Sequence, residues 1–470
     1  MQSQANLELW QQHHHYDPDL WLEPWPKRSA IGKSLRKQTP RESHANWSAA
    51  HNRPDPIEFL KSTNQGRQEH LIPIRMGRMS ASPFAFLRGA AAIMAWDLAK
   101  TAVSDIQVIL DGDAHLNNFG LYGTQQRTVV FDLDDFDEVT FGPWEWDLKR
   151  LVASVNVAGR DNGLDRVARR EAVLNCVAGY RDNANHLMPL RVLEVWYLHH
   201  HPGEEHPLVK PDAKTRKVFK KAVKKARKRT NVTLLEKVAH RSVGGGWRFN
   251  DDPPILQRTD PETAQKVIAA LTPYAQTLSP ERGFMFQRYR VADVAHRVVG
   301  VGSVGLRAYL VMLFGNDDDD PLFIQVKEAA KPVLSPYTPV LLPNASHQGQ
   351  RVAYGQRVLQ AATDVLLGWT LIDDRPFYVR QMKNMKGSIP IEWLKGSAFP
   401  SYAHACGTLL ARAHARSGDI AKIAGYCGTS AALDDALADF AEAYGDQTEK
   451  DYEALGKAIA AGQVPAERGV

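Results

Sequence analysis

The residues best suited to chemistry lie in one acidic stretch, residues 109–138. The apolar run from Ile106 to Leu110 predicts a short buried strand. It ends on the sequence Asp-Gly-Asp at residues 111–113, where the chain must turn and polar side chains emerge. We therefore expect an active or binding site in this stretch.

Two oxygen-bearing side chains of the stretch are candidate metal ligands. A second apolar run, residues 128–131, predicts another strand and ends on Asp132. If residues 119–122 pair with this run across a turn at residues 123–124, Asn118 and Asp132 lie at neighbouring strand ends and could hold one Mg²⁺. The alternative is a solvated loop, because Asp and Asn are common turn formers.

The pattern Gly-Asp-x-His-x-x-Asn at residues 112–118, with a further Asp at a strand end, resembles the catalytic and metal loops of kinase-like phosphotransferases, above all the aminoglycoside and choline kinase branch. The resemblance implies that Asp113 orients the acceptor hydroxyl and takes its proton. It also implies that Asn118 and Asp132 hold Mg²⁺ on the phosphates of ATP. Three further carboxylates follow, Asp134, Asp135 and Asp137, and one of them could bind a second metal ion. We include Asp134 among the expected metal ligands.

A helix follows the acidic stretch. Apolar residues recur at helical spacing from Trp144 to Val155, which places Asp147 in the first turn. In the aminoglycoside kinase branch an Asp at this place braces the backbone of the catalytic loop, so the resemblance implies that role for Asp147. A carboxylate that only complements the helix dipole is the alternative.

A second helix is expected before the acidic stretch. Ser-Pro at residues 82–83 predicts its start, and apolar residues recur at helical spacing as far as Leu98. Three arginines, Arg75, Arg78 and Arg88, lie close to this start. They could bind a phosphate or carboxylate group, or form salt bridges with the aspartates of the acidic stretch.

A glycine-rich motif, G-x-G-x-x-G, lies much later in the chain and contains Gly300, Gly302, Ser303 and Gly305. A Rossmann motif would continue into a helix, but residues 306–313 alternate and predict a strand, so a hairpin is expected. Glycines at a hairpin tip let backbone N–H groups approach phosphates. We therefore expect the motif to bind nucleotide, and a hairpin without a ligand is the alternative.

The next predicted strand, residues 322–329, carries Lys327 where kinase-like proteins have the lysine that pairs with phosphates. The helix expected to face it, residues 346–368, contains no glutamate, unlike the usual Lys-Glu pair. Four residues could replace that glutamate: Gln356, Gln360, Asp364 and Glu328. Gln381, at the end of a predicted hairpin, would border the adenine pocket like a hinge.

The order of these motifs is the reverse of that in ordinary kinases, because the glycine motif and Lys327 follow the acidic stretch. We therefore expect an α+β, kinase-like fold of two lobes that is circularly permuted and carries extra helices. The expected division is an N-terminal extension (1–60), a helical lobe with the catalytic and metal loops (61–250), a β-rich nucleotide lobe (251–395) and C-terminal helices packed on the helical lobe (396–470). Residues 82–89, 112–120 and 142–150 also resemble a bacterial family known as domain of unknown function 2252.

Composition points to a soluble globular protein. The 470 residues are 44% hydrophobic and 24% charged. No apolar run approaches the roughly 18 residues that predict a membrane span, and the N-terminal residues lack the pattern of a secretory signal. Three widely spaced cysteines suggest neither a disulfide framework nor a zinc site. A cytoplasmic location without membrane contact is expected.

The net charge of +5 is concentrated in Lys210–Arg229, which predicts a basic amphipathic helix. This helix could bind a polyanion such as RNA, or it could simply be solvated.

Phosphoryl transfer from MgATP to an unidentified hydroxyl-bearing small molecule or macromolecule is the leading functional hypothesis. The missing helix glutamate leaves open a nucleotide-binding pseudoenzyme or regulatory module, and a nucleotidyl transferase is a variant on the same fold. A two-metal phosphoesterase is a further alternative, because the acidic stretch contains suitable ligands.

Overall fold

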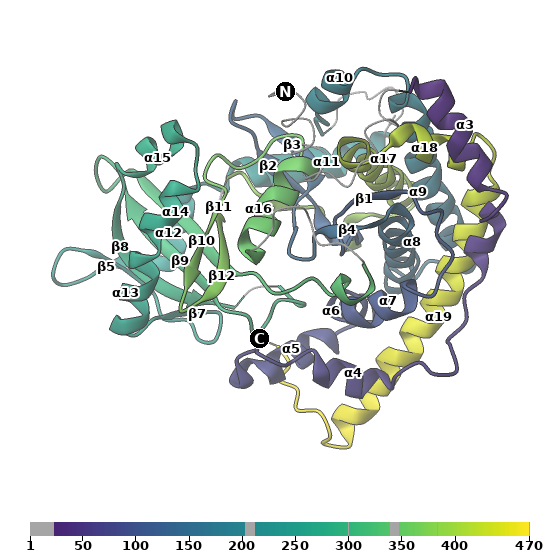
Figure 1. Cartoon of the computed structure of the whole chain (residues 1–470). Helices are drawn as coiled ribbons and strands as arrows, with labels where there is room; N and C mark the ends of the chain where they lie inside the picture. Colours follow the sequence, from purple (N-terminus) through teal and green to yellow (C-terminus); the bar gives the residue numbers. More distant parts are fainter. Residues whose placement is uncertain (1–22, 203–211, 299, 339–346, 383, 470) are drawn as a thin grey trace, which may run out of the picture.

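The computed structural model describes residues 23–202, 212–298, 300–338, 347–382 and 384–469. Figure 1 shows a mostly helical body beside a smaller one built on a sheet, with helix α16 (Gln348–Leu359) between them. We call residues 23–202, 212–227 and 384–469 the helical part, and the described residues of 228–382 the sheet part. The protein is α+β, as expected, and its sheets are antiparallel.

The helices of the helical part are α3 (Trp25–Leu35), α4 (Pro56–Ser62), α5 (Ile72–Met79), α6 (Pro83–Gly89), α7 (Ala91–Leu98), α8 (Trp144–Asp161), α9 (Arg166–Leu187), α10 (Val192–Tyr197), α11 (Ala213–Arg227), α17 (Ala398–Ser417), α18 (Ile420–Cys427) and α19 (Ala432–Ala460). Its strands are β1 (Gln107–Leu110), β2 (Phe119–Gly123), β3 (Val129–Leu133), β4 (Thr140–Pro143) and β13 (Gly387–Ser388). No helix in the described ranges is both long and apolar enough to cross a bilayer.

Besides α16, the helices of the sheet part are α12 (Asn231–Val238), α13 (Pro261–Ala269), α14 (Leu271–Gln276) and α15 (Pro280–Phe286). Its strands are β5 (Ala239–Arg241), β6 (Trp247–Phe249), β7 (Leu256–Arg258), β8 (Arg290–Arg297), β9 (Ala308–Phe314), β10 (Pro321–Glu328), β11 (Gly368–Ile372) and β12 (Arg375–Gln381). Short 3-10 helices are η1 (Arg41–Ala45), η2 (Glu69–Leu71), η3 (Leu116–Asn118), η4 (Ser335–Tyr337) and η5 (Ile391–Trp393).

The large sheet has six antiparallel strands in the order β11-β12-β10-β9-β8-β7. Side chains alternate between the faces of a sheet. Val326 and Val379 therefore share one face, where they form an apolar core with residues of α13, α14 and α15. Lys327 and its cross-strand neighbour Tyr378 share the opposite face, which is the face turned toward the helical part, because both side chains contact Asp137.

Three small strand pairs carry the acidic stretch. β1 pairs with β4, and β2 pairs with both β3 and β13. The strands predicted at residues 106–110, 119–122 and 128–131 are therefore confirmed. The loop joining β2 to β3 is longer than the predicted turn, because Thr124 N donates to Thr128 O at 2.8 Å. β3 is also longer and ends at Leu133, so Asp132 lies inside the strand.

Two predicted helices were too long. The helix expected from residue 83 to Leu98 is split at Ala90, whose φ of -104° and ψ of 28° are not helical. The preceding Gly89 fits this break, since glycine weakens helices and a Cβ there would lie 2.4 Å from Met79 Cγ. The helix expected over residues 346–368 is α16, which ends at Leu359, and Ala361 N donates to the side chain of Asp132 at 3.0 Å instead of extending the helix.

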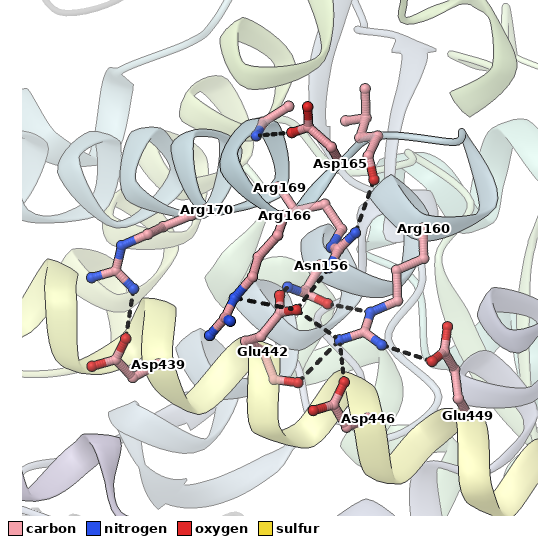
Figure 2. Close-up of polar contacts among 12 residues, drawn as sticks. Asn156, Arg160, Asp165, Arg166, Arg169, Arg170, Asp439, Glu442, Asp446 and Glu449 are labelled. Carbon is pink, nitrogen blue, oxygen red and sulfur yellow. Dashed lines mark hydrogen bonds and ion pairs between the residues drawn. The ribbon is translucent and has the colours of Figure 1, made fainter.

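An ion-pair network joins α19 to α8 and α9, as Figure 2 shows. Its centre is Glu442 on α19, which accepts hydrogen bonds from Arg169 Nη2 and Asn156 Nδ2, both at 2.7 Å. Arg160 also contacts Glu442, and it bonds Asp446 and Glu449 one and two helical turns further along. Because several donors converge on one half-buried carboxylate, the network holds the last helix against the helical part.

We expect Glu442→Gln to lower the free energy of unfolding by about 1–2 kcal/mol near neutral pH, because hydrogen bonds to a charged group are lost. Burial raises the pKa of Glu442, but Arg169, Asn156 and Arg160 outweigh it, so the pKa is lowered on folding. This stabilisation is therefore present above the unfolded-state pKa of about 4.3 and is lost as pH falls through the lower folded-state pKa. Urea unfolding at neutral and acidic pH measures both effects.

The matched control is Asp439→Asn, because the Arg170–Asp439 pair is largely exposed, at 41% and 59%. Exposed pairs contribute about 0–1 kcal/mol. Equal losses for the two variants, or a Glu442→Gln effect that grows in acid, would contradict this account.

Candidate active-site cleft

A cleft of about 650 Å³ lies between the acidic stretch and the glycine motif. The acidic stretch contributes Asp113, His115, Asn118, Asp135, Asp137 and Glu138 to its wall, and the loop between β8 and β9 contributes Gly300, Gly302 and Ser303. Residues far apart in sequence therefore face one hollow. Another hollow of about 770 Å³, beside α13, α14 and α15, has a mostly apolar lining without Asp, Glu, His, Lys or Arg.

The loop after β1 is held by Asp147 from the first turn of α8. The carboxylate of Asp147 accepts hydrogen bonds from Asp111 N at 2.7 Å and Gly112 N at 3.0 Å. Gly112 has a φ of 82°, and a Cβ there would lie 2.1 Å from Glu138 O, so only glycine fits. The contact expected of Asp147 is therefore present. His414 of α17 lies 3.2 Å from the same carboxylate and helps to orient it.

Asp113 projects into the cleft beside a buried cation. Arg150 donates from Nε and Nη2 to Asp113 Oδ1, at 2.9 and 2.6 Å. Burial raises the pKa of Asp113 to about 6, and Arg150 opposes that rise. Burial and the charges of Arg88 and Arg150 hold the pKa of His115 well below its usual value, so its ring is neutral. The sequence pattern does not predict the contact of Arg150 with Asp113; its only signal is that Arg150 lies in a segment, residues 142–150, that resembles a bacterial family.

Asp132 does not reach the cleft, contrary to the expected ligand pair. Its carboxylate pairs with Arg412 of α17 and accepts hydrogen bonds from Tyr122 Oη at 3.2 Å and Ala361 N at 3.0 Å. The physical reason is that β3 continues past Asp132, so this side chain points into the helical part and not out of a strand end. Asn118 does line the cleft, and its Nδ2 donates to Asp113 O at 2.8 Å.

Asp134 is also engaged elsewhere. It pairs with Lys386 at 3.3 Å and lines a separate small pocket with Gln381. Gln381 itself donates to Asp364. Lys383, next to the expected hinge, lies outside the described residues. The cleft thus contains neither Asp134 nor Gln381 among its lining residues.

Asp135 and Asp137 are the carboxylates that the structure brings to the cleft from the end of the acidic stretch. Asp135 Oδ1 is buried and has no hydrogen-bond partner among the described residues. Asp137 pairs with Lys327 and accepts a hydrogen bond from Tyr378 Oη at 2.8 Å. Burial lowers the pKa of Lys327, but Asp137 outweighs it and raises the pKa above its usual value, so Lys327 is charged.

The open question of the partner of Lys327 is answered by Asp137, not by α16. The four candidates contact other groups: Glu328 pairs with Arg307 and Arg375, Gln356 donates to Gln360, and Asp364 binds Gln381. Instead, α16 contributes Arg351, which is fully buried and donates to Asp137 O, Val139 O and Ala330 O. The helix therefore positions the acidic stretch through its backbone.

The glycine loop is a hairpin connection, as predicted, because β8 and β9 pair. Gly300 and Gly305 have φ values of 72° and 91°, which favour glycine. The residues before α6 hold this loop: Gln68 N donates to Gly305 O at 2.8 Å, and Arg78 Nη1 to Gly300 O at 2.6 Å. Residues of this segment, including Gly66 and Arg67, form a wall of the cleft, which the sequence pattern does not predict.

Within the described residues, no group of three or more His, Cys, Asp or Glu side chains could hold a metal ion by itself. A site that needs several protein ligands per metal is therefore not preformed. A cation shared between protein oxygens and the phosphates of a ligand needs fewer protein ligands, and Asn118 and Asp135 are available for it.

Comparison with known proteins identifies a family. Searches of curated proteins and of solved structures gave no match. Residues 67–458 match the family described as "Uncharacterized protein conserved in bacteria (DUF2252)". The match covers most of the chain, including the acidic stretch, the glycine motif and Lys327, and the chain therefore belongs to this family.

Proposed function

We propose that this protein is an ATP- and Mg²⁺-dependent phosphotransferase with a kinase-like, circularly permuted fold. The observation that carries the proposal is the cleft, which Asp113 and Asn118 share with Gly300 and Gly302 from a loop about 180 residues later. The ion pair of Lys327 with Asp137 joins the two parts beside it. Chain order does not affect such a site, because function depends on where side chains meet.

The residues present fit MgATP. The glycine loop offers backbone that lacks Cβ atoms, and Asp135 Oδ1 is a buried anionic oxygen without a partner in the described chain. Asn118 uses its amide nitrogen to bind Asp113 O, which leaves the amide oxygen for a cation. When bound, Mg²⁺ would neutralise charge on the phosphates. We therefore assign the cation to Asn118 and Asp135 rather than to Asp132 and Asp134.

Asp113 takes the role of the group that aligns the acceptor hydroxyl and accepts its proton. Arg150 keeps the carboxylate oriented, and Asp147 fixes the loop backbone behind it. Lys327 is a fixed positive charge beside the cleft, where phosphates would be neutralised. Catalysis of this kind depends on positioning and electrostatics, which buried ion pairs and a braced loop supply.

The test is to titrate the wild-type protein with a non-hydrolysable ATP analogue and Mg²⁺ by calorimetry, and then to follow label from ATP into products. Binding that requires Mg²⁺, with transfer of γ-label, is the expected result. Transfer of α-label instead would indicate a nucleotidyl transferase, and binding without turnover on any acceptor would indicate a pseudoenzyme. If the wild type binds no nucleotide, the proposal is wrong.

A further inference from the structure

Arg88 is a partly buried cation that has no hydrogen-bond or ion-pair partner among the described residues. It is the sixth residue of α6 and lines the cleft. Its guanidinium makes no hydrogen bond or ion pair with any residue that the structure describes, and its Nε is completely buried. A guanidinium that is partly removed from water and has no carboxylate in hydrogen-bond contact is costly, so this arrangement is typical of a site that is completed by an anionic ligand.

The position of Arg88 is central to the cleft. Its charge acts on Asp113, Asp135 and His115, although no carboxylate pairs with it. Its backbone O faces the glycine loop, where a Cβ on Gly302 would lie 3.5 Å away. Arg88 therefore stands between the acidic stretch on one side and the tip of the glycine loop on the other.

The neighbouring cations are already engaged or more exposed. Arg150 binds Asp113, and Lys327 binds Asp137. Arg67 uses Nε and Nη1 to bind Thr63 O and Val304 O. Lys331 lines the cleft but is exposed. Within the described residues, an anion entering the cleft thus finds at Arg88 a partly buried guanidinium that is not committed to another group, and a guanidinium matches the geometry of a phosphate.

We propose that Arg88 binds a phosphate oxyanion in the cleft beside Asp113. This inference deepens the proposed function and rests on it for its role in transfer. The oxyanion has two sources with the same chemistry: the terminal phosphate of the nucleotide, or a phosphate group carried by the acceptor. In either case Arg88 provides charge-assisted hydrogen bonds to oxygens next to the reacting groups.

The test compares three single variants: Arg88→Gln, Arg88→Lys, and Lys331→Gln, which removes an exposed cation from the same cleft. Calorimetry measures the affinity of each protein for inorganic phosphate, pyrophosphate, MgADP and the magnesium complex of β,γ-imido-ATP. We expect Arg88→Gln to lower the affinity for phosphate or pyrophosphate about 10- to 100-fold, since hydrogen bonds to charged groups contribute about 1.5–3 kcal/mol. The affinity of Arg88→Lys should lie between those of the wild type and Arg88→Gln. Lys331→Gln should change the affinity by less than about 3-fold, because exposed charges are screened.

The nucleotides separate the two sources. If Arg88 binds the terminal phosphate, Arg88→Gln lowers the affinity for β,γ-imido-ATP and leaves the affinity for ADP unchanged. If it binds a phosphate group of the acceptor, the affinities for both nucleotides are unchanged, and the wild type saturated with β,γ-imido-ATP still binds inorganic phosphate through Arg88. Melting of the ligand-free protein is the structural readout: removing an unpaired buried charge should leave the Tm unchanged or raise it, whereas a structural role would lower it.

Two results overturn the inference: Arg88→Gln that binds phosphate, pyrophosphate and β,γ-imido-ATP as the wild type does, or a wild type that binds none of these anions. Failure of the proposed function gives a different pattern, because phosphate binding that depends on Arg88 would persist without any nucleotide binding.

Discussion

Asp113→Asn is expected to reduce phosphoryl transfer about 10²- to 10⁴-fold, the range for loss of a general base, while the affinity for MgATP stays within a few-fold. Asparagine keeps the size of the side chain but cannot take the proton of an acceptor hydroxyl. Single-turnover transfer from γ-labelled ATP and calorimetric nucleotide binding, measured on the same preparation, separate the two effects.

Arg150 lets the role of Asp113 be tested further. Its guanidinium is bound to Asp113 Oδ1 in a largely buried site. The neutral Asn variant loses this ion pair and can keep only hydrogen bonds to its amide oxygen, so its Tm must be recorded beside its activity. An Asp113→Asn protein that is folded and transfers phosphate within about 3-fold of the wild-type rate would exclude Asp113 as the base.

Asp132→Ala is expected to lower the free energy of unfolding by about 3–5 kcal/mol, because it leaves Arg412 as an uncompensated buried charge. Arg412 and Asp132 are only 5% and 1% exposed at their side chains. The double variant Asp132→Leu/Arg412→Met should recover most of that loss, since apolar replacement of both partners of a buried pair is often neutral. Chemical denaturation of the three proteins measures the effect.

Asp135→Asn is the matched comparison from the same stretch, three residues away. Its Oδ1 has no partner to lose among the described residues, so stability should change by less than about 1 kcal/mol, but the Mg²⁺ dependence of nucleotide binding should be lost. The opposite pattern, with Asp132→Ala stable and insensitive to Mg²⁺ and Asp135→Asn unfolded, would restore the ligand assignment made from sequence.

The sequence predicted local structure better than the identity of the ligands. Alternating apolar residues and turn formers gave the β2–β3 hairpin and the hairpin around the glycine motif, since these patterns depend on neighbours in the chain. The sequence pattern ends strand β3 at Asp132 and therefore predicts that Asp132 faces the cleft, but the strand continues to Leu133. Because successive side chains of a strand point to opposite faces, an error of one residue in the position of a strand end can place a side chain on the wrong side, and sequence patterns seldom locate strand ends that closely.

The remaining misses concern partners distant in sequence. Arg412 lies 280 residues from Asp132, and Asp137 lies 190 residues from Lys327. No periodicity in the chain reports which helix will cross which strand. Arg88 is one of three arginines that the sequence places near a helix start. It lacks a carboxylate partner in the cleft because Asp113 pairs with Arg150 instead, and the sequence does not predict that choice.

Three of the hydrogen bonds of Arg351 have a consequence for how this protein can vary and move. All three acceptors are main-chain oxygens, so a change of side chain at positions 137, 139 or 330 removes none of them. The bonds from α16 to the main chain at positions 137 and 139 therefore depend on one side chain, that of Arg351. A movement of α16 would therefore also move the segment that contains Asp137, the counter-ion of Lys327.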